Sequence, residues 1–338
     1  MESVSLSSER EGSIGQNPPG QPLQQGYPRQ GTSGHRLHKP GVAGSSPAAA
    51  TLSHSESITS YHSDREWWSK SQLWTFHSSG PAAFHARYLS PTPQPYGSSD
   101  ALKKGTHVHE WAEAGDEAWH DRVVLIPEDA LGAGGRRTKA TDQFESDTLA
   151  KKPDAILLKA DELDAYKAQF AAILANTQFR ELTEATIARE FSVRWHDPSG
   201  LQLRCRPDAV TDDCVWDIKT TREAKPLETF WKSVVDFGYG YQQSLYLSGM
   251  EAAGLPIKKF VFVVTSTVPP YRCHAVTLPA RLVASATKQL RKTIAELQAR
   301  LELDHWLPDD SEQVTELYIP ERFMEARDVV GSALRWVQ

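Results

Sequence analysis

The order of helical and strand-like segments predicts an α/β fold with a mixed central sheet and flanking helices. Strand-like segments gather at residues 188–219, with helix-like segments on both sides. Two more strand-like segments and a long surface-type helix at residues 280–303 close the order. Helices and strands mixed in this way pack as layers around one sheet, so the order indicates the α/β class.

The segments ahead of the strand cluster are mainly helical. Three of them carry apolar residues at helical spacing: residues 69–79, 101–114 and 160–175. Asp161 and Glu162 open the third helix, where acidic side chains favour a helix start. A short strand at residues 123–126 and a glycine- and arginine-rich loop at 132–139 are expected between the last two helices.

The strand cluster reads as a three-stranded meander. Its segments are residues 188–195, 201–210 and 215–219. Residues 197–200 form a turn sequence, and residues 211–214 are rich in turn-forming residues. Two helices and two strands are then expected before the last helix: residues 227–235, 239–253, 259–265 and 272–276.

Composition suits one large domain with tails. The chain has 338 residues, of which 39% are hydrophobic and 24% charged. We expect a low-complexity, disordered tail at residues 1–55, a folded domain at 56–330 and a short tail at 331–338. Residues 41–51 look like a translated tRNA 3′ end, which suggests a start assigned too far upstream in a mobile-element gene. An ordinary low-complexity tail is the alternative.

Charge and cysteine content narrow the class of protein. A formal net charge of -6 argues against a coat of positive charge, so any nucleic-acid contact must use a local basic surface. No apolar run reaches the length of a membrane span. The three cysteines are widely spaced and form no Cys-x-x-Cys pair, which indicates reduced thiols in a cytoplasmic protein.

Two carboxylates and a lysine lie on adjacent predicted strands. Asp208 follows Pro207, while Asp217 and Lys219 alternate with Ile218 and therefore share one face of their strand. A hairpin can bring both carboxylates to one point, where they resemble a Mg²⁺ site with a charged helper. The alternative for the isolated pattern is a pair of turn-flanking aspartates and a solvent-facing lysine.

Three further residues gain meaning beside this pair. His109 lies in the second expected helix, at residues 101–114, and Glu190 lies at the start of the first strand of the meander. Gln242 lies in the helix expected at residues 239–253. Alone, His109 has an ordinary explanation as part of a polar helix face, and Glu190 as an exposed strand residue. The aromatic residues around Gln242, from Tyr239 to Tyr246, more often belong to a core than to a functional site. The His107-x-His109 pair lacks the spacing of a zinc-protease helix.

Together these residues carry a resemblance to a known family. Residues 67–327 resemble the RecE-type exonucleases (the exodeoxyribonuclease VIII nuclease domain) and, more distantly, lambda exonuclease. Both belong to the restriction-endonuclease-like PD-(D/E)xK superfamily. The resemblance lies in these motifs: Ser69-Lys70-Ser71, Gly105-Thr106-x-x-His109, Arg204-Cys205-Arg206-Pro207-Asp208, Asp217-x-Lys219-Thr220-Thr221 and Tyr241-Gln242.

The resemblance implies a role for each matching residue. The implied metal ligands are His109, Asp208, Asp217 and the carbonyl of Ile218, with Mg²⁺ as the cofactor and Mn²⁺ as a substitute. Lys219 would orient or activate water, and Gln242 and Glu190 would support the site. Ser71, with Lys70 beside it, matches a serine that contacts phosphate in such enzymes. Further candidate DNA backbone contacts are basic side chains, with a solvated surface charge as the alternative for each arginine: Arg136, Arg137, Lys139, Arg204, Arg206 and Arg222.

The resemblance also implies an activity and partners. We expect a 5′→3′ exonuclease for double-stranded DNA ends that leaves 3′ single-stranded tails for phage-type recombination. Its partners would be a single-strand annealing protein and further copies in a ring-like homo-oligomer, in a bacterial host cytoplasm. The alternatives are a restriction-type endonuclease, a CRISPR-associated nuclease or a DNA-binding phage protein with a decayed site.

Overall fold

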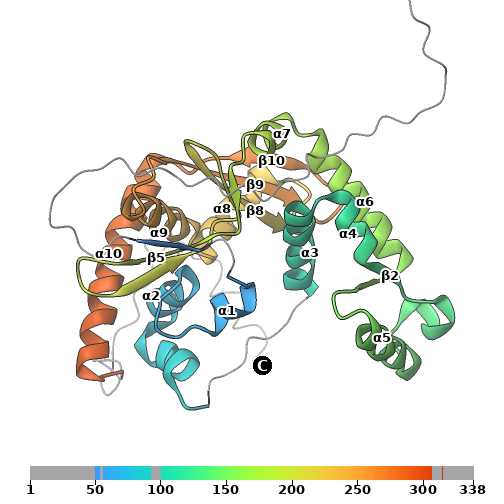
Figure 1. Cartoon of the computed structure of the whole chain (residues 1–338), viewed down its shortest axis with the longest axis horizontal. Helices are drawn as coiled ribbons and strands as arrows, with labels where there is room; N and C mark the ends of the chain where they lie inside the picture. Colours follow the sequence, from blue (N-terminus) through green and yellow to red (C-terminus); the bar gives the residue numbers. More distant parts are fainter. Residues whose placement is uncertain (1–49, 54–55, 93–99, 307–313, 315–338) are drawn as a thin grey trace, which may run out of the picture. The chain divides into compact units, whose positions relative to one another are not determined.

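A computed structural model describes residues 50–53, 56–92, 100–306 and 314 of the chain. Within these residues the secondary structure is mixed, with a five-stranded, a three-stranded and a two-stranded sheet and helices around them (Figure 1). The expected α/β class is therefore confirmed. None of the described helices is long and apolar enough to cross a membrane. The predicted tail up to residue 49 and the boundary at residue 330 lie outside the described residues.

The five-stranded sheet is mixed, as the sequence indicates. Its order is β10 (Cys273–Val276), β9 (Lys259–Ser266), β8 (Cys214–Thr221), β7 (Ala209–Val210) and β4 (Ala188–Arg189). Strands β8 and β9 run parallel with Asp217 opposite Phe262, and every other neighbouring pair is antiparallel. Because β7 is only two residues long, the outer half of β8 has no neighbouring strand on that side.

The three-stranded sheet contains β1 (Thr51–Ser53), β5 (Ser192–His196) and β6 (Gln202–Cys205) in that order. Strands β5 and β6 form the predicted hairpin around the turn at residues 197–200. Strand β1 lies within the segment that we predicted as a disordered tail. That boundary was a few residues late, because Thr51–Ser53 pairs with the otherwise free edge of β5.

The prediction of two continuous strands at residues 188–195 and 201–210 was wrong. Each breaks in the middle, so that β4 and β7 pair in the large sheet while β5 and β6 pair in the small one. Glu190 interrupts the first with a left-handed φ of 47°. Pro207 lies in the second break and has no N–H to donate to a ladder. The paired breaks form a bend that carries Glu190 and Asp208.

Strand β8 is covered on both faces. Trp216 and Ile218 point into one apolar cluster with residues of α3 (Asp100–Ala114) and α6 (Ala160–Ala175). Val215 points into the other, with residues of three helices: α2 (Lys70–Phe84), α9 (Tyr239–Ala252) and α10 (Ala280–Leu303). Side chains alternate along a strand, so Asp217 and Lys219 lie on the α9 face.

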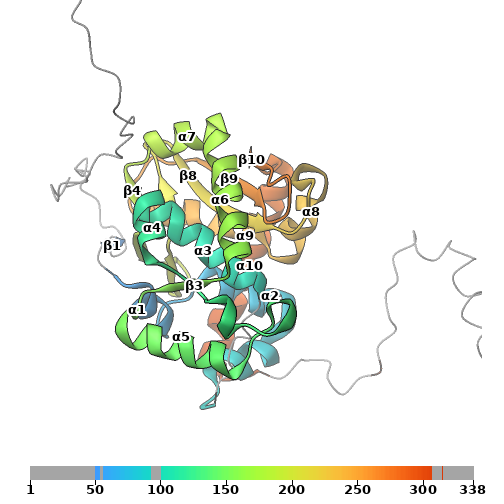
Figure 2. The same cartoon turned by 90° about the vertical axis from the view of Figure 1, so that its right-hand side faces the viewer.

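Several elements were absent from the sequence prediction. They are short or polar: α1 (Ile58–Ser63), α4 (Asp116–Arg122), α5 (Lys139–Lys151), β3 (Ile156–Leu158) and α7 (Thr177–Glu184). Helix α8 (Pro226–Asp236) was expected, and the predicted strand near residue 123 is β2 (Val123–Leu125). It pairs in parallel with β3, close to α5 in Figure 2. One π-helical turn (His85–Leu89) and two 3-10 turns (Glu128–Ala130, Ala133–Gly135) complete the order.

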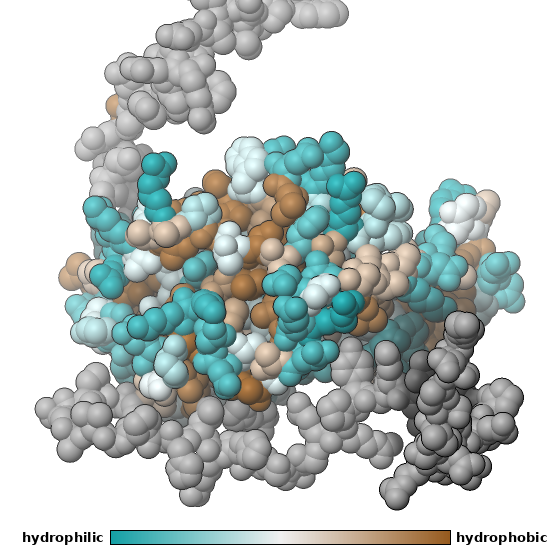
Figure 3. Space-filling model, turned by 90° about the horizontal axis from the view of Figure 1, so that it is seen from above, coloured by the Kyte–Doolittle hydropathy of each residue, from teal (hydrophilic) through white to brown (hydrophobic). Residues whose placement is uncertain are grey.

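Hydrophilic and hydrophobic residues are mixed on the face seen from above. There, hydrophobic residues gather near the middle between hydrophilic areas (Figure 3). Apolar residues at the surface are normal for a folded domain. Polar side chains meet where the bend contacts α3 and the unpaired half of β8.

Candidate active site

A cleft of about 1810 Å³ contains most of the predicted site residues in its wall. Five of the lining side chains come from three helices and the bend: Lys70, His109, Glu190, Asp208 and Gln242. Lys219 also lines the cleft, whereas Asp217 is 1% exposed and lies behind it. The structure therefore brings together residues that are up to 172 positions apart, from Lys70 to Gln242.

Asp208 replaces the missing strand at the edge of β8. Its Oδ2 accepts a hydrogen bond of 2.8 Å from the backbone N–H of Ile218. The N–H and C=O of a strand residue point to the same edge, and those of neighbouring residues point to opposite edges. The carbonyl of Thr221, three residues on, accepts from Thr267 beyond β9. The Ile218 carbonyl therefore faces the Asp208 edge, where the sequence predicted a backbone ligand.

His109 reaches the same carboxylate from α3. Its Nδ1 lies 3.1 Å from Asp208 Oδ2, and the neighbouring Val108 and Trp111 anchor α3 in the core. Burial disfavours a charged imidazole, but the Asp208 carboxylate outweighs it and raises the pKa of His109 to about 9. Burial likewise opposes the Asp208 charge, yet His109, Lys219 and the Ile218 N–H lower the pKa of Asp208 to about 2.

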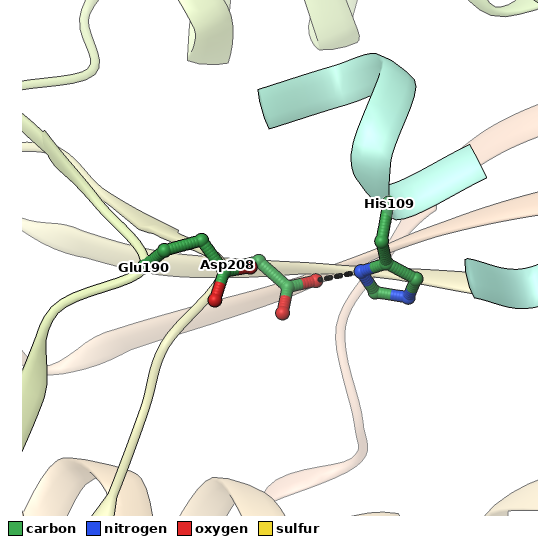
Figure 4. A group of neighbouring side chains, drawn as sticks. All are labelled: His109, Glu190 and Asp208. Carbon is green, nitrogen blue, oxygen red and sulfur yellow. Dashed lines mark ion pairs between the residues drawn. The ribbon is translucent and has the colours of Figure 1, made fainter. Parts of the chain in front are cut away.

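Glu190 completes a cluster with this pair. One ligand atom each from His109, Glu190 and Asp208 lies within 4.8 Å of the others, and Figure 4 shows the three side chains converging. The Glu190 N–H also donates to the Asp208 carbonyl at 3.1 Å. Burial and the nearby Asp208 raise the pKa of Glu190 to about 7, which Arg206 partly offsets. Its left-handed backbone costs about 1–3 kcal/mol, a strain that is common at functional sites.

Asp217 belongs to a second group next to this cluster. Lys219 Nζ donates to Asp217 Oδ2 at 2.8 Å, and the Gln242 amide donates to Oδ1. Lys219 Nζ also lies 5.0 Å from the centre of the Tyr239 ring. Burial and Asp208 raise the pKa of Asp217 to about 6, against the opposite effect of Lys219. The structure thus groups Glu190, rather than Asp217, with His109 and Asp208.

A comparison with known protein families identifies the family of the chain. Residues 69–317 match the family model of a PDDEXK-like domain of unknown function (DUF3799). The chain belongs to this family.

A solved structure shares the fold of this PDDEXK-like domain. It is a crystal structure from Eubacterium rectale of a protein provisionally named an exonuclease, with a TM-score of 0.50 and 14% sequence identity. The match covers 81% of this chain and 98% of that chain, and it is evidence of fold alone. No curated protein matches the sequence. The mixed sheet and flanking helices are consistent with the restriction-endonuclease-like fold.

The cluster in this PDDEXK-like domain suits a hard divalent cation. Two carboxylates and one imidazole converge within 4.8 Å at the cleft wall. Mg²⁺ prefers oxygen ligands, and an imidazole also admits Mn²⁺. The ionised Asp208 supplies charge for such an ion. His109, Glu190 and Asp208 are therefore the described residues that could hold it, and Asp217 would act from behind them.

The predicted phosphate contacts divide into two groups. Lys70, Ser71 and Arg222 line the cleft. Lys70 donates to the carbonyl of Phe237, and burial, together with the nearby Lys219, lowers the pKa of Lys70 to about 7. Arg206 also lines the cleft, but its guanidinium is committed to Glu190.

The other predicted contacts lie outside the cleft wall or are buried in it. Arg136, Arg137 and Lys139 are outside the cleft lining, and Arg137 pairs with Asp142 and Glu145 of α5. Arg204 contributes to the lining but is 2% exposed, with its guanidinium turned to backbone carbonyls of residues 61 and 64. A buried side chain with these partners supports the fold, so Arg204 is poorly placed for DNA.

Two groups of cleft residues escaped the sequence reasoning. Tyr239 packs its ring against Lys219 and Lys70, although its aromatic pattern indicated only core. Glu56, Tyr61 and Asp64 line the cleft from a segment just past the predicted tail. Only the abrupt return of aromatic residues after residue 58 signalled that this segment is folded.

Proposed function

We propose that this PDDEXK-like protein is a divalent-metal-dependent nuclease that hydrolyses phosphodiester bonds in DNA. The observation that carries the proposal is the convergence of His109, Glu190 and Asp208 in the cleft, with Lys219 beside them. Pro207-Asp208 and Asp217-Ile218-Lys219 spell the pattern after which such domains are named. Carboxylates around a cation and one positioned lysine are what hydrolysis of a phosphodiester requires.

The residues divide the work of hydrolysis. When bound, Mg²⁺ lowers the pKa of coordinated water and neutralises charge on the phosphate. His109, Glu190 and Asp208 would hold the ion, and the Ile218 carbonyl faces the edge of β8 at which Asp208 lies. Lys219 has its ammonium in the cleft wall and donates hydrogen bonds to the attacking water or to a phosphate oxygen.

Asp217, Gln242 and Tyr239 keep Lys219 in place. Asp217 accepts from Lys219 at 2.8 Å and from the Gln242 amide, so the carboxylate is fixed from two elements. The Tyr239 ring, 5.0 Å from Lys219 Nζ, limits the ammonium from the other side. A charge held in this way needs little reorganisation during the reaction.

The finer assignment is a 5′→3′ exonuclease of the RecE type that acts on ends of duplex DNA and leaves 3′ tails. Its support is the order of the motifs shared with that family and the name of the Eubacterium rectale protein. On this proposal the enzyme is phage- or prophage-encoded, acts in the bacterial cytoplasm as a ring-like homo-oligomer, and passes its product to a single-strand annealing protein.

One assay tests both the proposed nuclease activity and the finer assignment as an exonuclease. Purified protein is incubated with linear duplex DNA labelled at the 5′ or 3′ end, and with circular duplex DNA, in Mg²⁺, Mn²⁺ or EDTA. We expect metal-dependent loss of linear DNA, early release of the 5′ label, and intact circles. Cleaved circles would replace the exonuclease by an endonuclease. Inactivity with both metals on all substrates would overturn the nuclease proposal and favour a DNA-binding role.

A further inference from the structure

Arg206 connects the proposed metal cluster to the segment before α1. Its Nε donates to Glu190 Oε2 at 2.8 Å. Its Nη1 donates to the backbone carbonyl of Glu56 at 2.9 Å and to the Ser192 hydroxyl at 3.3 Å. The guanidinium is planar and rigid, so contacts on two sides fix its orientation and that of the Glu190 carboxylate.

Residues 56–65, here called the N-terminal strap, are themselves held by two more arginines. The Glu56 carboxylate makes two hydrogen bonds with Arg194 of β5, at 3.0 and 2.5 Å, and Asp64 makes a third at 3.0 Å. Arg204 of β6 donates to the carbonyls of Tyr61 and Asp64 and lies 4.5 Å from the centre of the Tyr61 ring. These pairs are largely buried, so solvent screens them little.

The strap adds to what the family match covers. That match begins at residue 69, whereas the strap lies ahead of it and still lines the cleft with Glu56, Tyr61 and Asp64. The carbonyl that receives Arg206 also belongs to the strap. A segment outside the matched region therefore reaches within two hydrogen bonds of Glu190.

We propose that Arg206 is a positioning residue that holds the Glu190 carboxylate toward the metal, and that the N-terminal strap fixes Arg206 for this task. The inference rests on the proposed function, because it takes Glu190 as a ligand. Glu190 is close to Asp208, and two carboxylates repel each other unless a cation lies nearby. Without Arg206 the long Glu190 side chain can turn away from Asp208, and the cluster loses a ligand before the metal arrives.

The test measures Mn²⁺ binding to the full chain by calorimetry and by electron paramagnetic resonance, without DNA. Loss of a partner that orients a metal ligand lowers affinity about 10–100-fold, so we expect Arg206→Met to fall in this range. Arg206→Lys should recover part of the loss, since an ammonium can still pair with Glu190. Thermal unfolding of each variant reports its fold, and Arg206→Lys serves if Arg206→Met does not fold.

A double-mutant comparison separates positioning from general damage. If Arg206 acts through Glu190, Arg206→Met in a Glu190→Gln background should cause no further loss of Mn²⁺ affinity. Losses that multiply, or a folded Arg206→Met variant with unchanged affinity, would overturn the proposal. Arg206→Lys is likewise compared in the wild-type and in the Glu190→Gln background.

The strap has a matched control on the surface of the same chain. Glu56→Ala removes two hydrogen bonds to Arg194, and Glu145→Ala removes two to Arg137, which lies outside the cleft lining. We expect Glu56→Ala to weaken Mn²⁺ binding several-fold and Glu145→Ala to leave it unchanged. Equal Mn²⁺ affinities of the Glu56→Ala and Glu145→Ala variants would refute the role of the strap. Absence of Mn²⁺ binding by the unaltered protein would instead refute the proposed function.

Discussion

His109 Nδ1 lies 3.1 Å from Asp208 Oδ2 and thereby joins helix α3 to the bend between the two sheets. The contact brings a helix residue and a loop residue to the unpaired edge of β8. Asp208 also accepts from the Ile218 N–H, so one carboxylate is shared by three elements. A metal ion would need His109 as a neutral ligand, and the same pair would then give up its proton.

The first prediction concerns pH and the stability of metal-free protein. The pKa of His109 is raised to about 9 from its ordinary value of 6.5, with Asp208 as the favourable cause. The ion pair of His109 with Asp208 therefore stabilises the folded state fully below about pH 6.5. This stabilisation is lost as the pH rises through 9. In EDTA, the Tm difference between wild type and His109→Gln should shrink from pH 6 to pH 10.

A histidine control accompanies this measurement. His196→Gln changes an exposed histidine of β5 and reports the general effect of pH on such a replacement. A Tm difference for His109→Gln that stays constant, or that grows toward pH 10, would contradict the ion pair.

The second prediction concerns Asp217. Asp217→Asn should lower single-turnover cleavage in Mg²⁺ by at least about 100-fold, because the buried carboxylate fixes Lys219 beside the cleft. The protein should stay folded by circular dichroism, since burial and Asp208 already raise the pKa of Asp217 to about 6 and disfavour its charge. Asp213→Asn is the control, as Asp213 pairs with Lys259 at the exposed start of β8. Turnover retained in Asp217→Asn would refute the assignment.

The third prediction separates chemistry from metal binding. Lys219→Ala should slow hydrolysis by about 100-fold or more while Mn²⁺ affinity stays close to wild type, because the lysine contacts Asp217 and not the three clustered ligands. Rapid-quench kinetics and calorimetry give the two quantities. Lys259→Ala removes an exposed lysine from an equally short pair and should change neither. Unchanged cleavage by Lys219→Ala would count against its role.

The fourth prediction concerns the turn that starts α9. Gly238 has a φ of 61°, and an added Cβ would clash with the Trp74 ring. Gly238→Ala should cost the left-handed strain of about 1–2 kcal/mol plus about 1–3 kcal/mol of overpacking. Gly200→Ala shares the positive φ but meets open space, so it should cost the strain alone. Chemical denaturation measures both, and equal losses would contradict the packing of Trp74 against this turn.

Part of the fold could be predicted because it depends on local patterns. The helices near residues 69, 101, 160, 239 and 280 were predicted from apolar periodicity and end signals. Breaks in the strands at Glu190 and Pro207 were not, because sheet pairing between distant segments decides whether a strand continues. Polar helices such as α5 also escaped, since they carry little apolar periodicity.

The candidate site divides in a similar way. The motifs at Asp208 and Asp217-x-Lys219, with His109 and Gln242 in order, named four of the residues that line the cleft: His109, Asp208, Lys219 and Gln242. Their grouping was not predictable from the order. The bend turns Glu190 toward His109 and Asp208, whereas strand alternation turns Asp217 toward Gln242 and Lys219.

The sequence by itself determined the α/β class, the motif order and the residue types that suit a cation and a phosphodiester. Only the tertiary structure decided which carboxylates share a point, which arginines are committed to the fold, and that residues 56–65 reach the site. The physical reason is the distance along the chain over which each kind of interaction acts. Periodicity and turn residues act over a few positions, but the Arg206 contacts with Glu190 and Glu56 join residues that only the tertiary structure brings together.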